Sequence, residues 1–71
     1  MYKFIRLVNN RQALLTKEGK HFIASFADVA GSGPEVLVFP ATASGEVFDY
    51  LEVDGGRGYR SLQEFLNEKG Y

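Results

Sequence analysis

Short apolar stretches, separated by turn-forming residues, occupy most of the chain. Residues 2–8 (YKFIRLV) are rich in β-branched and aromatic side chains, and the pair Asn9-Asn10 that follows favours a turn, because asparagine tolerates positive φ. The pattern predicts a hairpin into residues 11–16. Residues 11–17 (RQALLTK) also fit a short helix, since Ala and Leu prefer helices, but so short a segment is a poor helix by itself, which favours the strand.

Two further breaks divide the middle of the chain. Gly19 within TKEGK predicts a turn, after which residues 21–27 resume an extended pattern. AGSGPE is a second breaker, and the nearly continuous apolar run at 35–39 (EVLVF) that follows it is typical of a central strand buried on both faces. Residues 46–53 (EVFDYLEV) alternate, so we predict that they form a hairpin with 35–39.

The C-terminal segment has the marks of a short amphipathic helix. Ser61 and Glu64 match the S-x-x-E capping box, in which each side chain accepts a hydrogen bond from the other residue's amide. Lys69 complements the helix dipole, and Gly70 with Tyr71 fits a Schellman motif at the helix end. The apolar face of this helix is expected to comprise Leu62, Phe65 and Leu66.

The glycine-rich stretch DGGRG at 54–58 leads into this helix and is expected to make a tight turn. An anion site at the helix N-terminus is the alternative, because free amides and Arg57 and Arg60 would point toward a phosphate. The stretch matches neither of the common phosphate-binding glycine motifs, which favours the turn.

These elements predict one α+β domain spanning residues 1–71: a small antiparallel, meander-like sheet of four to five strands with one C-terminal α-helix packed on it. A chain of this length buries only a small core. There is no cysteine and His21 is the only histidine, so we expect no disulfide, metal or cofactor, and no catalytic residues. Asp49 and Glu52 are three residues apart, so a regular strand would point them to opposite faces, against a metal site.

The charges are unevenly distributed along the chain. Residues 1–21 carry five basic groups and one acidic group, whereas residues 22–71 carry three basic and eight acidic groups. Such asymmetry favours a polar binding face, unless the folded sheet interleaves the two halves. The residues that we expect to contact a partner are Lys3, Arg6, Arg11, Tyr50, Arg57, Tyr59 and Arg60.

Residues 36–66 resemble a group of short uncharacterised proteins encoded by tailed bacteriophages. The shared features are the LVFP strand, the GEV turn, an acidic-aromatic strand and a glycine segment before the helix. The resemblance implies a phage accessory protein that works in the bacterial cytoplasm by occupying the surface of a host protein.

We therefore expect a non-enzymatic protein-interaction module in the cytoplasm. Charges at Lys3 and Arg6 interrupt the N-terminal apolar run, so neither a signal peptide nor a membrane span is expected. The alternative is a nucleic-acid-binding module that uses the basic N-terminal hairpin, provided that its basic side chains share a face. A weak homodimer is also expected, through the strand at 22–27, which bears few charges.

Overall fold

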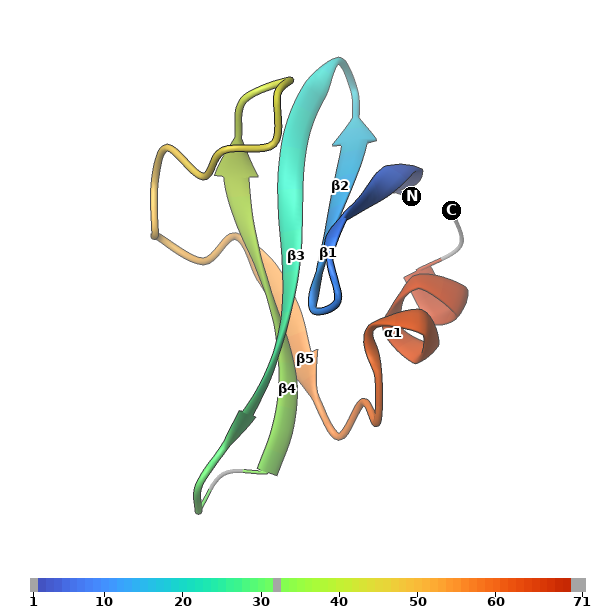
Figure 1. Cartoon of the computed structure of the whole chain (residues 1–71), viewed down its shortest axis with the longest axis vertical. Helices are drawn as coiled ribbons and strands as arrows, with labels where there is room; N and C mark the ends of the chain where they lie inside the picture. Colours follow the sequence, from blue (N-terminus) through green and yellow to red (C-terminus); the bar gives the residue numbers. More distant parts are fainter. Residues whose placement is uncertain (1, 32, 70–71) are drawn as a thin grey trace.

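A computed structural model of the chain describes residues 2–31 and 33–69. It contains a five-stranded antiparallel sheet of order β1-β2-β3-β4-β5, followed by one helix (Figure 1). This confirms the predicted α+β meander with a C-terminal helix. The elements are β1 (Lys3–Asn9), β2 (Gln12–Lys17), β3 (Lys20–Val29), β4 (Gly33–Ala41), β5 (Asp54–Arg57) and α1 (Leu62–Lys69).

Both predicted N-terminal turns are present, but only the second uses positive φ; the first relies on a side-chain hydrogen bond, and neither Asn9 nor Asn10 has positive φ. In the first, the Asn9 side-chain oxygen accepts a hydrogen bond from the Arg11 amide at 2.8 Å. In the second, Glu18 and Gly19 both have positive φ, 54° and 79°, which matches the twist of two-residue hairpin turns. In the segment 11–17, Arg11 belongs to the first turn and residues 12–17 form a strand, not a helix, because pairing with β1 and β3 outweighs the helix preference of Ala and Leu.

The sheet buries its larger core on the face toward α1. Alternate side chains point to this face because the side-chain period of a strand is two residues. Tyr2, which precedes β1, joins this cluster, and Phe4, Phe22, Phe26 and Tyr59 pack around it. Its buried strand and helix residues are Ala13, Leu15, Ala24, Val36, Val38, Leu62, Phe65 and Leu66.

The opposite face carries a smaller cluster at one end of the sheet. Leu14 and Ile23 are opposite each other across β2 and β3, and both are buried with Ala41 of β4. Val8 and Val47 pack against them. The residues of 35–39 that point to this face, Glu35, Leu37 and Phe39, are only half-buried, so the predicted burial of this strand on both faces is wrong.

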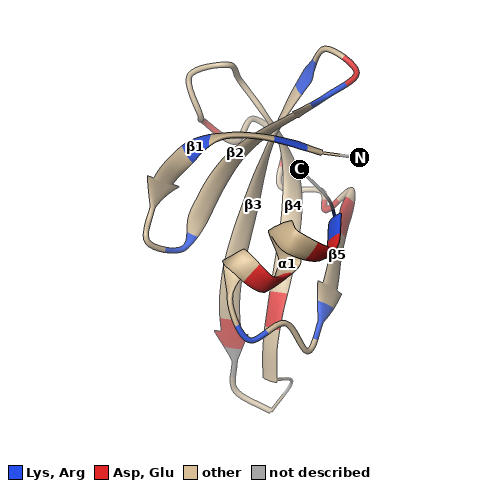
Figure 2. Ribbon diagram, turned by 90° about the vertical axis from the view of Figure 1, so that its right-hand side faces the viewer, with Lys and Arg blue, Asp and Glu red and all other residues tan. Residues whose placement is uncertain are grey.

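Helix α1 lies across the sheet in front of β3 and β4 (Figure 2). The Ser61 hydroxyl accepts a hydrogen bond from the Glu64 amide at 3.2 Å, which confirms the Ser61 half of the cap. Phe65 is fully buried, and the Tyr59 ring meets it edge-on with centroids 5.2 Å apart. The expected Schellman motif at Gly70 and Tyr71 lies outside the described residues.

The predicted strand at 46–53 is wrong: this segment is a loop, and β5 is the glycine-rich segment that we expected to be a turn. Close packing explains why the glycine-rich segment, and not 46–53, forms the strand beside β4. A Cβ atom at Gly55 would overlap the carbonyl oxygen of Val36, and one at Gly56 would lie 2.6 Å from the Tyr59 ring. Only glycines allow the chain to approach β4 and the helix connection this closely, so tertiary packing overrides the β-propensity of 46–53.

Candidate functional site

The loop at 42–53, which we name the acidic apolar loop, runs beside β4 and is anchored to the sheet. The amide of Phe48 donates to the carbonyl oxygen of Pro40 at 3.2 Å, and the amide of Val53 donates to that of Val38 at 2.9 Å. Near its start, the guanidinium of Arg6 donates to the carbonyl oxygen of Ser44 at 3.0 Å. The backbone of the loop is therefore held at both ends.

Large apolar side chains on this loop point into solvent. Phe48 is 68% exposed, Tyr50 78%, Leu51 71% and Val53 51%. The Tyr50 ring leans on Phe39 of β4, with ring centroids 5.5 Å apart. A concentration of exposed apolar groups in one short segment is typical of a contact surface, whereas single exposed apolar residues are ordinary.

Three carboxylates lie on the same loop, one before Phe48 and two between the exposed apolar residues. Glu46, Asp49 and Glu52 are all exposed, and none of them forms an ion pair with another residue of the described chain. One oxygen of Asp49 accepts a hydrogen bond from the Leu51 amide at 2.9 Å, which fixes the backbone between the two most exposed apolar residues. The loop thus presents apolar area and negative charge together.

A shallow pocket opens between this loop and the ends of β3 and β4. Its volume is about 570 Å³. Phe48 and Val53 supply the loop side of the pocket, so the exposed apolar residues continue into a concave surface. The remaining lining residues are Lys20, His21, Phe22, Pro40 and Ala41.

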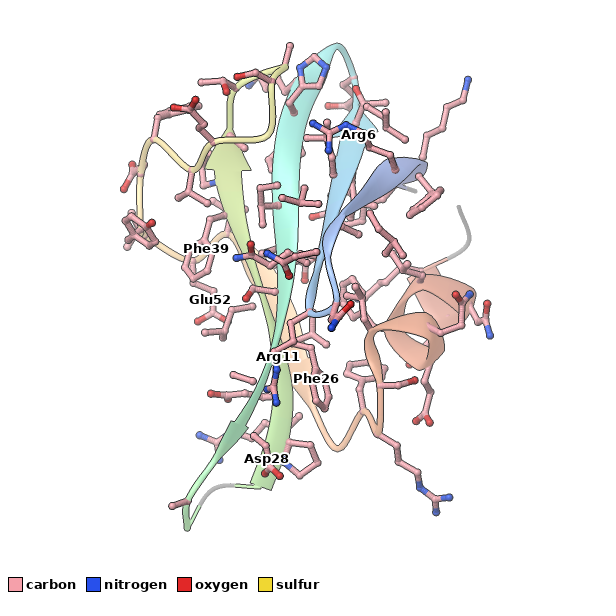
Figure 3. The ribbon with its side chains drawn as sticks, viewed as in Figure 1. Arg6, Arg11, Phe26, Asp28, Phe39 and Glu52 are labelled. Carbon is pink, nitrogen blue, oxygen red and sulfur yellow. The ribbon has the colours of Figure 1, made fainter. Side chains whose placement is uncertain are left out.

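The basic residues of the N-terminal half do not gather on one face. Lys17 lies on the helix side, with its ammonium 5.1 Å from the centroid of the Tyr2 ring. Arg6 reaches the loop on the opposite side through Ser44. Figure 3 shows Arg6 and Arg11 well separated, with Arg11 near the first turn. Lys3, Arg6 and Arg11 are exposed, as a contact role requires, but they form no continuous positive groove with Lys17.

The three predicted contact residues near the helix, Arg57, Tyr59 and Arg60, differ in exposure and in their neighbours. Arg57 is exposed and lies 3.9 Å from a carboxylate oxygen of Glu35. Arg60 is exposed, whereas Tyr59 is half-buried and its hydrogen bond to Glu68 raises its pKa. The Gly58 amide already donates to Pro34, so the glycine segment does not offer the row of free amides that an anion site needs.

Asp54 connects the two ends of the sheet. One of its oxygens accepts from the Tyr2 hydroxyl at 2.9 Å, the other from the Gly55 amide at 2.7 Å, and Lys69 lies 3.9 Å away. Burial alone would raise the pKa of Asp54, but these hydrogen bonds and the nearby Lys69 and Lys17 outweigh it and lower the pKa. Burial, together with the bond to Asp54, raises the pKa of Tyr2 to about 12.

The carboxylates of this region hold no metal-binding arrangement. Within residues 2–31 and 33–69, no three His, Cys, Asp or Glu side chains converge closely enough to bind a metal ion. Asp54 is committed to Tyr2 and Gly55, while Asp49 lies on the exposed loop.

The expected dimer contact at 22–27 is wrong as a sheet edge. β3 is paired with β2 on one side and with β4 on the other, so its backbone groups are already used. The free edges of the sheet belong to β1 and β5.

Sequence reasoning named only one member of the exposed apolar group, Tyr50. Phe48, Leu51 and Val53 were missed because a strand at 46–53 would have buried one of its faces. A signal was present, since each face of that strand would have carried a carboxylate, Asp49 on one and Glu52 on the other. A strand with no uncharged face is better suited to solvent than to a core.

No protein-family model, curated protein or solved structure matches this chain. Among the described residues, no helix has the length and apolar content needed to cross a membrane.

Proposed function

We propose that this protein is a non-enzymatic interaction module that binds a protein partner through the acidic apolar loop. The observation that carries the proposal is the exposure of Phe48, Tyr50, Leu51 and Val53, each more than half accessible on one anchored segment. Aromatic residues at the centre of an interface commonly dominate its binding free energy.

The anchoring of the loop favours binding. Hydrogen bonds from Phe48 and Val53 to β4 restrict the backbone before any partner arrives. Association then orders less chain, so less of the contact free energy is lost to conformational entropy. The carboxylates of Glu46, Asp49 and Glu52 favour a partner whose rim is basic, because complementary charges speed encounter and reject unsuitable surfaces.

The phage resemblance indicates where such a partner is found. The loop falls within residues 36–66, the segment that resembles tailed-phage proteins. We accordingly propose action in the bacterial cytoplasm on a host protein. The alternative function, nucleic-acid binding, has less support, because Lys17 and Arg6 lie on different sides of the sheet and the most exposed loop is acidic.

The test is a double variant, Tyr50→Ser with Leu51→Ser. Immobilised wild-type protein captures partners from a bacterial extract, and the captured protein is identified, purified and titrated against both forms. We expect binding to weaken by about tenfold or more, since truncating a single hot-spot side chain costs about 2 kcal/mol or more and about 1.4 kcal/mol corresponds to a factor of ten. The variant should stay folded, because both side chains are largely exposed.

Asn67→Ala, an exposed change on α1, is the matched control and should bind like wild type. Equal affinity of the loop variant and wild type for the purified partner would overturn the role of the loop.

A further inference from the structure

The edge strand β1 offers a surface that is complementary to the acidic apolar loop. β1 pairs only with β2, and its Ile5 and Leu7 are 43% and 58% exposed. Lys3 and Arg6 are exposed beside them, and of these two Arg6 already donates to Ser44 of its own loop. The chain has no acidic residue before Glu18, so this edge combines apolar side chains with positive charge only.

The start of the loop contacts β1 of its own chain, where Arg6 donates to Ser44, but the apolar tip of the loop, residues 48–51, lies away from β1. β1 is the first strand in the sheet order, whereas the apolar half of the loop, residues 48–53, hydrogen-bonds to β4 near the other edge. Figure 1 shows them on opposite sides of the twisted sheet. Residues 48–51 therefore do not cover β1 of their own chain.

We propose that a second copy of this chain is a partner of the loop, with the loop of one copy docked on the β1 edge of the next. This inference rests on the proposed function of the loop and names the partner. Tyr50 and Leu51 would meet Ile5 and Leu7, and the loop carboxylates would face Lys3. Apolar side chains would then contact apolar side chains, and the loop carboxylates would face a lysine. Such a contact is complementary in both polarity and charge.

Symmetric arrangements are disfavoured by the same charges. A two-fold contact between β1 edges would oppose Lys3 and Arg6 to their own copies, and a loop-to-loop contact would oppose the carboxylates. β1 also has register shifts between Phe4 and Arg6 and between Leu7 and Asn9. Such bulges discourage a long edge-to-edge ladder, so side chains carry the contact. The association is head-to-tail and extends to further copies unless the rotation closes a ring.

Two variants test this arrangement because each removes one surface. The loop variant is Tyr50→Ser with Leu51→Ser, and the edge variant is Lys3→Glu with Ile5→Ser. Sedimentation velocity follows each alone, an equimolar mixture, wild type and the Asn67→Ala control, over concentrations up to about 1 mM, where even association near −4 kcal/mol is visible.

We expect wild type and Asn67→Ala to increase in mean mass with concentration, and each variant alone to stay monomeric. The mixture should form a complex that stops at two chains, because only the loop of the edge variant and the edge of the loop variant remain. Raising salt from about 0.01 to about 1 M shortens the Debye length from about 30 to about 3 Å and should weaken the complex.

Monomeric wild type throughout would overturn self-association while leaving the capture of another protein by the loop untouched. Dimers of the edge variant alone would overturn the head-to-tail arrangement, since they would show loop-to-loop contact. The head-to-tail arrangement would also be overturned if wild type associated while the mixture of the two variants stayed monomeric.

Discussion

The Asp54 carboxylate joins residues that are far apart in the sequence. Asp54 is the first residue of β5 and accepts a hydrogen bond from the hydroxyl of Tyr2, the residue just before β1. This hydrogen bond therefore links the two edge strands. The ring of Tyr2 also meets Phe22 edge-on, with centroids 5.6 Å apart. The Tyr2 hydroxyl must keep its proton to donate this hydrogen bond to the Asp54 carboxylate. Burial of the ring likewise favours the neutral, protonated form.

Alkaline pH should therefore weaken the fold through Tyr2. The pKa of Tyr2 is raised from 10.0 to about 12 in the folded chain, so the stabilisation is complete below pH 10. Above that, the unfolded state loses the proton first, and stability falls until the pH passes about 12. Urea titrations between these limits should show a smaller decline for Tyr2→Phe than for wild type. Parallel declines of the two proteins would contradict this assignment.

Helix α1 depends more on its buried face than on its cap. Phe65→Ala should lower the free energy of unfolding by about 3–5 kcal/mol, because the ring is fully buried between Tyr59 and the sheet. Ser61→Ala should cost only about 1 kcal/mol, since it removes one hydrogen bond to the Glu64 amide. Urea denaturation gives both values, and similarly small effects would show that the helix is not firmly packed.

The elements with local signals were predictable from the sequence. The Asn9 side chain holds the first turn, the positive φ of Glu18 and Gly19 forms the second, and the helix cap at Ser61 is a property of four neighbouring residues. The fifth strand was not predictable in this way. It depends on contacts of Gly55 with Val36 and of Gly56 with Tyr59, which exist only after the chain has folded.

The same distinction applies to the candidate site. Composition showed that the second half of the chain is acidic, and Tyr50 was expected to be a contact residue. The exposure of Leu51 and Val53 follows from the displacement of their segment by β5, which is a competition between two segments for the edge of β4. Propensity scales describe each segment alone and do not resolve such competition.

At the scale of the whole molecule, the order of the strands in the sheet is their order in the chain. Each strand pairs with its immediate neighbour, and the first four strands are joined by short turns, so little loop entropy is lost when they pair; only β5 follows a longer loop. The packing of α1 on β3 differs, because it joins distant segments and needs the sheet as its base. The topology thus implies a sequence of events, with the β2–β3 hairpin early and helix docking late.

Folding kinetics should separate these events. Leu14→Ala, which disturbs the contact across β2 and β3 with Ile23, is expected mainly to slow folding, whereas Phe65→Ala should mainly accelerate unfolding. Stopped-flow measurements in urea resolve the two rates for each variant. If Phe65→Ala slowed folding as strongly as Leu14→Ala, helix docking would belong to the transition state. If Phe65→Ala instead mainly accelerates unfolding, the sheet forms before the helix docks. The docked helix then determines the lifetime of the folded state.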